Sequence, residues 1–149
     1  MIKSLTANAR TGAIDFTLPT VLLDDMAAPI PQIIDLDPIT LDESTEVALQ
    51  LWFAYGSGAG TEFKVYVQTT LDDGNQWFDV ACLVFGIVSA RRNLSLIKGA
   101  TPINTALDGG LADNTVLNSG VVPLGTKLRL KVAVNGVYVQ SVLSGRASL

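Results

Sequence analysis

The side chains of this chain that could do chemistry are carboxylates, and few of them are arranged in pairs. Asp72 and Asp73 stand together in the stretch TLDDGNQW, and Asp35 and Asp37 fall on one face if residues 33–37 form a strand. Two facing carboxylates can hydrolyse a glycosidic bond. The chain has no histidine, which removes Ser-His-Asp and Cys-His arrangements and most zinc sites. Because no carboxylate stands in an obvious apolar pocket that would raise its pKa, we expect no catalytic residue and no cofactor site.

Calcium is the metal that the available oxygen ligands could hold. The stretches DDGN at 72–75 and DGGLADN at 108–114 supply Asp, Asn and backbone oxygens. Neither has the spaced ladder of Asp and Asn ending in Glu that a dedicated calcium loop shows. We therefore interpret both stretches as solvated turns and expect no metal site.

The single cysteine, Cys82, excludes an intramolecular disulfide. It lies in DVACLVF, which reads as an apolar strand. A reactive thiol needs a cationic or helix-terminal neighbour, and none is near in the sequence. We expect a buried structural thiol.

Length, composition and charge limit the possible partners. The chain has 149 residues, enough for about one domain, with 48% hydrophobic and 16% charged residues. Its net charge is −4, and residues 1–50 hold eight acids against two bases. That excess argues against nucleic acid, whose binders cluster Lys and Arg. No apolar run is long enough to span a bilayer and residues 1–32 lack the order of a signal peptide, so we expect no membrane partner.

The sequence from about residue 46 onward predicts antiparallel strands with one face exposed to solvent. Apolar and polar residues alternate in EVALQLWFAY, EFKVYVQTTL and KLRLKVAV, and turn sequences such as LDDGNQ and VNGV separate the runs. This pattern predicts an all-β fold, a single jelly-roll-like β-sandwich of about eight strands. The predicted core residues are Leu49, Leu51, Phe53, Val65, Val67, Leu130 and Val132.

Two stretches lack this alternation. Residues 1–32 contain three prolines and predict an extended N-terminal arm that precedes a sandwich domain at 33–149. We expect the arm to take its order mainly from a neighbour, with Asp24 and Asp25 as interface acids. Residues 97–125 are long for an unstructured connection, which favours a functional loop, a disordered one or one ordered by a partner.

Outward-facing aromatic residues leave two interpretations open. Trp52 and Tyr66 fall on the outward parity of their strands, and with Tyr55 and Tyr138 they could form a platform for sugar. The alternative is that these rings pack against the arm, a second sheet or a neighbouring subunit. We favour the second interpretation, which makes Trp52 and Tyr66 possible interface residues.

The stretch at 70–77 resembles an Asp-box, the hairpin motif of sialidases and other glycan-processing propellers. The matching residues are Thr70, Asp72, Gly74 and Trp77. In those enzymes the motif lies away from the catalytic centre, so the resemblance implies a structural turn. No internal repeat accompanies it, which excludes a propeller.

A second resemblance covers more of the chain. The segment FKVYVQTTLDDGNQWFDVACLVF, within residues 46–90, is similar to small β-sandwich proteins encoded in the structural-gene clusters of tailed bacteriophages, and residues 121–147 follow more loosely. The resemblance implies a non-enzymatic virion component, a decoration or cement protein on the capsid exterior. Its partners would be the major capsid protein and its own copies in a trimer. The alternatives are a tail or head–tail junction protein, and a carbohydrate-binding or host-attachment module.

Overall fold

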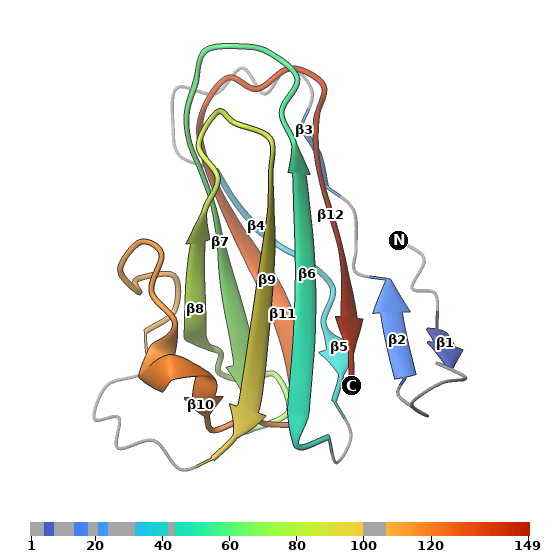
Figure 1. The fold of residues 1–149 in the computed structure, drawn as a ribbon. Coiled ribbons are helices and arrows are strands. Elements are labelled where there is room, and N and C mark those ends of the chain that lie inside the picture. The colour runs from blue at the N-terminus through green and yellow to red at the C-terminus, as the bar shows by residue number, and fades with distance from the viewer. Residues whose placement is uncertain (1–4, 8–13, 18–20, 24–31, 42–43, 100–106) are drawn as a thin grey trace.

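The structure is a computed structural model that describes residues 5–7, 14–17, 21–23, 32–41, 44–99 and 107–149. These residues form two β-sheets that pack face to face (Figure 1). Sheet A follows the order β1 (Leu5–Ala7), β2 (Ile14–Thr17), β12 (Ser141–Ser148), β6 (Glu46–Ala54), β9 (Ala90–Lys98) and β10 (Val121–Val122), with β3 (Val21–Leu23) also on β12. Sheet B follows the order β4 (Gln32–Asp35), β11 (Lys127–Gly136), β7 (Gly60–Thr70) and β8 (Phe78–Val84), with β5 (Ile39–Thr40) on β11.

The strand order is that of a jelly roll. The connections β6–β7, β8–β9 and β11–β12 each carry the chain from one sheet to the other. If β2 with β3 and β4 with β5 each count as one position, the sheets read β2–β12–β6–β9 and β4–β11–β7–β8. Eight positions in two four-stranded sheets are the jelly-roll arrangement. The predicted all-β, jelly-roll-like sandwich of about eight strands is confirmed.

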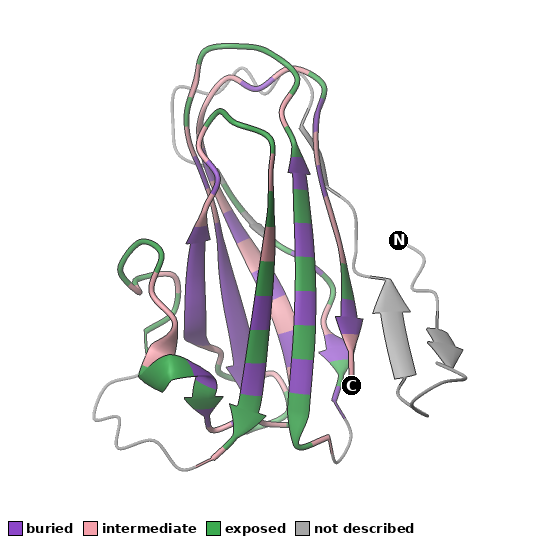
Figure 2. Cartoon of the chain, in the orientation of Figure 1, coloured by how far each residue is buried: buried purple, intermediate pink, exposed green. Residues whose placement is uncertain are grey.

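The core lies between the sheets, where the alternation placed it. Along β6 buried and exposed residues alternate without a break (Figure 2). All seven predicted core residues are buried. At one end of the core Phe53 stacks on Phe63 with ring centroids 4.3 Å apart, and the Tyr138 ring meets both edge-on. The Tyr138 hydroxyl donates a 2.6 Å hydrogen bond to the Gly86 carbonyl.

The outer face of sheet B is partly buried, whereas the sequence predicted that it would be exposed to solvent. On β7, Tyr66 and Gln68 point outward as their parity predicts, yet both are buried. The cover comes from residues 107–116, whose backbone also runs along the edge of β8. Asp79 N donates to the Leu107 carbonyl at 2.6 Å, and Cys82 N donates to the Thr115 carbonyl at 2.9 Å. The chain's own loop therefore pairs with backbone groups of the edge strand β8 that would otherwise be left without a partner.

The N-terminal segment is held in part by its own chain. Residues 14–17 and 21–23 pair antiparallel with β12, and 5–7 pair with 14–17. These strands pair with an edge of β12 that would otherwise be unpaired. The expectation that the segment takes its order mainly from a neighbour stays a prediction. The division of the chain at residue 32 stays a prediction.

Candidate functional site

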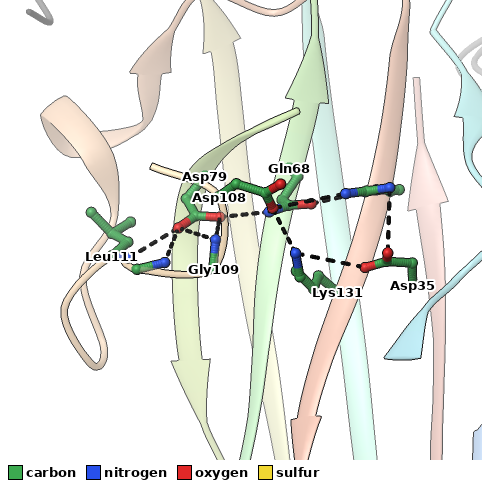
Figure 3. A network of polar contacts seen from close by, with 9 residues as sticks. Asp35, Gln68, Asp79, Asp108, Gly109, Leu111 and Lys131 are labelled. Atoms are coloured by element: carbon green, nitrogen blue, oxygen red, sulfur yellow. Dashed lines mark hydrogen bonds and ion pairs between the residues drawn. The ribbon is translucent and has the colours of Figure 1, made fainter. Parts of the chain in front are cut away.

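The densest polar cluster lies on the outer face of sheet B, and Asp79 of β8 is at its centre (Figure 3). Asp79 is 3% exposed, and its carboxylate accepts three backbone N–H groups from the loop that covers the sheet. Gly109 N lies 2.9 and 3.0 Å from its two oxygens, and Gly110 N and Leu111 N lie 2.9 and 3.0 Å from Oδ2. Successive backbone N–H groups of this kind form an anion-binding nest. Here the nest is filled by the chain's own carboxylate.

Gln68 of β7 links this nest to the charges beside it. Its Nε2 donates to Asp79 Oδ1 at 2.8 Å and to Asp108 Oδ1 at 2.7 Å. Its Oε1 accepts a 2.8 Å hydrogen bond from Arg129 Nε. Both polar ends of the buried amide are therefore satisfied, which removes the cost of burying it.

The network continues across β11 to β4. Lys131 Nζ lies 2.7 Å from Asp108 Oδ1 and 4.0 Å from Asp35 Oδ1, and Arg129 lies 3.8 Å from each of the same two carboxylates. Burial raises the pKa of Asp108, but hydrogen bonds from Lys131 and Gln68 and the charges of Lys131 and Arg129 outweigh it, so the pKa is lowered overall. Asp108 thus remains ionised at neutral pH and holds the start of the loop on sheet B.

Gln68, Asp79 and Asp108 act as a structural clamp, because their hydrogen bonds hold the covering loop on sheet B. Asp79 and Asp108 accept hydrogen bonds from their own chain, so neither is placed to take a proton from a substrate. Across the described ranges, no three residues of the types His, Cys, Asp and Glu stand close enough to share a metal ion. The expected absence of a catalytic, cofactor or metal site stays a prediction.

The Asp-box-like turn between β7 and β8 closes on its own side chains. Thr70 Oγ1 donates to Asp72 Oδ1 at 2.9 Å and accepts Gly74 N at 2.9 Å. Asp72 Oδ1 also accepts Gln76 N at 2.8 Å, and this backbone hydrogen bond is the main reason that the pKa of Asp72 is lowered. Gly74 has φ of +98°, a conformation that suits glycine.

Trp77, the residue that directly follows the turn, also contacts the polar cluster through Arg129. The Arg129 guanidinium lies 4.4 Å from the centroid of the Trp77 ring, at cation–π distance. The same Arg129 side chain binds Gln68, so the turn and the clamp share one cation.

Substitutions in the turn should weaken the fold without affecting a ligand site. We expect Gly74→Val to cost about 1–3 kcal/mol of unfolding free energy through its positive φ. Asp72→Ala should lower the melting temperature, because Gln76 N and Thr70 Oγ1 lose their acceptor. Thermal denaturation measures both effects. If Asp72→Ala abolishes binding to a glycan while its melting temperature is unchanged, the turn binds sugar instead.

The aromatic platform considered from the sequence is not formed. Trp52 lies on the outer face of sheet A and is 49% exposed, whereas Tyr66 lies on the outer face of sheet B and is 5% exposed. Tyr138 is fully buried in the core. The covering loop explains the burial of Tyr66, so of the two possible interface residues only Trp52 is exposed. Asp24 and Asp25 lie outside the described residues.

The outer face of sheet A has a different character from that of sheet B. Three cross-strand rows of outward side chains lie over β12, β6 and β9, and most of the side chains are small or neutral. The rows are Ser144–Trp52–Arg91, Arg146–Gln50–Asn93 and Ser148–Ala48–Ser95. The Arg91 guanidinium stacks over the Trp52 ring, 4.3 Å from its centroid. A shallow groove of about 440 Å³ runs along the second and third of these rows, from Arg146, Gln50 and Asn93 to Ser148, Ala48 and Ser95.

Cys82 is buried, as predicted. Burial and the nearby Asp113 charge, opposed in part by Lys64, raise the pKa of its thiol to about 11. The reactive thiolate is therefore scarce at pH 8, so Cys82 should resist a thiol reagent such as dithiobis-nitrobenzoate until denaturant unfolds the chain. Stoichiometric labelling of the native protein within minutes would contradict this expectation.

The sequence missed the clamp residues Gln68, Asp79 and Asp108. One available signal was an acid in the apolar strand FDVACLV, because a buried carboxylate needs donors. Another was the first glycine of the Gly-Gly pair, Gly109, whose φ of +79° suits glycine. None of the described residues forms a helix with the length and apolarity to cross a bilayer. No protein-family model matches the chain, and no curated protein matches its sequence.

Proposed function

We propose that this protein is a non-enzymatic structural component of a tailed-phage particle, a capsid decoration protein that stabilises the shell through contacts between subunits. Its resemblance over residues 46–90 to small virion sandwich proteins supports the proposal. The jelly-roll fold also supports it, since this architecture is used by viral capsid domains, although lectins use it as well. The partners would be the major capsid protein and further copies of the chain in a trimer.

The observation that carries the proposal is the outer face of sheet A. It is a broad strand surface on which no other described segment packs, and Trp52, with Arg91 stacked on it, is its one large exposed ring, in a row near one end of β6. Trp, Tyr and Arg are enriched among the residues that contribute most to the binding energy of protein interfaces. Small neutral side chains around them let a partner approach without desolvating many charges.

A decoration protein needs no reaction to perform this function. If it binds the assembled lattice more tightly than free subunits, each bound copy shifts the equilibrium toward the intact shell. The clamp on sheet B suits such a protein, because it fixes a long loop on the domain before any partner arrives.

A carbohydrate-binding or host-attachment module is the second candidate, and the half-exposed Trp52 ring favours it. Sugars stack on exposed aromatic faces, but Arg91 lies over this ring, and Tyr66 is buried on the opposite sheet. A tail or head–tail location would use the same surface with a different partner.

Rebinding to particles tests the proposal. Phage particles stripped of this protein should bind the purified wild type saturably, and decorated shells should dissociate at a higher temperature than bare ones. Trp52→Ala should lower the occupancy, measured by quantitative mass spectrometry. Val88→Ala, which trims an exposed apolar side chain in the β8–β9 connection, should not.

The outcomes separate the candidates. Wild type that does not bind any stripped particle would contradict the proposal. Binding of a specific glycan on an array that Trp52→Ala abolishes would favour the attachment module, provided that particle binding is unchanged.

A further inference from the structure

The groove on the outer face of sheet A is lined by polar side chains that have no partner in the chain. Its volume is about 440 Å³, and its lining comes from β12, β6 and β9. The polar side chains are those of Arg146, Gln50, Asn93, Ser148 and Ser95. Among the described residues, none of these five side chains has a hydrogen-bond or ion-pair partner.

The outer face of sheet B differs, because its polar side chains are bonded within the chain. Gln68 donates to Asp79 and Asp108, and Asp79 accepts N–H groups of the covering loop. On sheet A no described segment covers the groove, and Gln50 and Asn93 are exposed. The donors and acceptors of the groove are therefore available to a molecule from outside.

The groove suits a ligand that both donates and accepts hydrogen bonds. Its two carboxamides and two hydroxyls can each do both, and the Arg146 guanidinium donates. Sugar hydroxyls offer the same combination around a ring. Ala48 and Ser95 are small, so a ring can approach the polar groups on either side of them.

The formal charges around the groove favour an uncharged ligand. Glu46 of β6 and Asp15 of β2 lie in the same sheet as Arg91 and Arg146. The two acids offset the two arginines, so the face has no net charge that would select an anion or a cation.

The spacing of the polar side chains favours a glycan over an extended peptide. Arg146, Gln50 and Asn93 stand on adjacent strands, so neighbours in this row are about 4.8 Å apart. A sugar ring in an extended glycan advances the chain by nearly that distance. An extended peptide presents the same side every second residue, about 6.6–6.8 Å, and would fall out of step with the row.

We propose that the groove binds a neutral glycan. Its rings lie across β12, β6 and β9 over Ala48, and their hydroxyls exchange hydrogen bonds with the side chains of the two rows. The site is distinct from the Trp52 ring, which lies one row further along β6. It goes beyond the proposed function, because a shell contact through Trp52 requires no sugar ligand.

A glycan array probed with the purified full chain tests the site. The array carries neutral oligosaccharides and, for comparison, oligosaccharides with carboxylate or sulfate groups. We expect neutral glycans to bind, with an affinity that changes less than about twofold as salt rises, because no net charge is there to be screened. Gln50→Ala combined with Asn93→Ala should weaken the strongest interaction at least about tenfold in surface plasmon resonance, because several hydrogen bonds are lost.

A second variant blocks the groove without removing a donor. Ala48→Leu fills its floor and should weaken binding by a similar factor. Gln76→Ala, which removes an exposed amide from the turn between β7 and β8, should leave the affinity unchanged. Melting temperatures near that of the wild type separate a lost site from a misfolded chain. An array without any bound glycan, binding only to charged glycans, or binding that both groove variants leave unchanged would overturn the proposal.

This outcome is independent of the particle experiment. Glycan binding without binding to stripped particles would contradict the proposed function and support the groove site. Particle binding without any glycan binding would do the reverse. A copy bound to a shell through Trp52 would have less room at the groove, so glycan binding is measured on the free protein.

Discussion

Asp79→Ala should destabilise the protein by about 3–5 kcal/mol, because three backbone N–H groups of the covering loop lose their shared acceptor in a buried site. The Gln68 amide loses a partner as well. Asp79→Asn keeps the size of the side chain but replaces one acceptor oxygen by a donor, so it should be intermediate. Urea denaturation of the wild type, Asp79→Asn and Asp79→Ala should give unfolding free energies that decrease in that order.

The control is a carboxylate on the same face that makes few contacts. Asp113→Ala should change stability by less than about 1 kcal/mol, since its ion pair with Lys64 is exposed. Hydrogen exchange adds a local measurement, because the amides of Gly109, Gly110 and Leu111 should lose protection in Asp79→Ala. Asp79→Ala with wild-type stability and unchanged protection would show that another contact holds the loop.

Gly125→Ala should have the second large effect, above about 4 kcal/mol, and is expected to reduce the yield of folded protein. A Cβ at residue 125 would overlap the Thr70 carbonyl oxygen, which is backbone and cannot rotate away. The same carbonyl accepts Thr126 N at 3.1 Å, and Gly125 N donates to Thr69 Oγ1 at 2.9 Å, so the two segments are tied where they would have to separate.

Gly110→Ala is the matched control. A Cβ there would meet the Leu107 side chain at 3.8 Å, an ordinary van der Waals distance. We therefore expect its melting temperature to stay near that of the wild type. Equal melting temperatures for the two alanine variants would contradict the close packing of residue 125 on Thr70.

The sandwich could be predicted because its signal is local. Alternation in the strands around Leu49, Val65 and Leu130 identifies the core side of each strand without reference to any other. Turn chemistry then limits where strands end, and the absence of sustained helical periodicity leaves a two-sheet fold. The Asp72 to Gly74 turn has the same local character, as its hydrogen bonds span at most four residues.

The clamp could not be predicted, because its contacts are far apart in the sequence. Asp79 meets backbone groups 30 to 32 residues away, and Arg129 meets Gln68 across 61 residues. Parity alone places Tyr66 outward, and nothing in its own strand shows that a loop covers it. For the same reason the sequence of residues 97–125 favours a functional loop, a disordered one or one ordered by a partner, and does not show that residues 107–115 bind β8 of their own domain.

The most direct test of the proposed function, a decoration component of a phage shell, is cryo-microscopy of particles purified from the source of this sequence. We expect density for this jelly roll on the capsid exterior, at junctions between capsid subunits. Particles whose shells lack this density, and whose peptides by mass spectrometry do not include this chain, would contradict the claim.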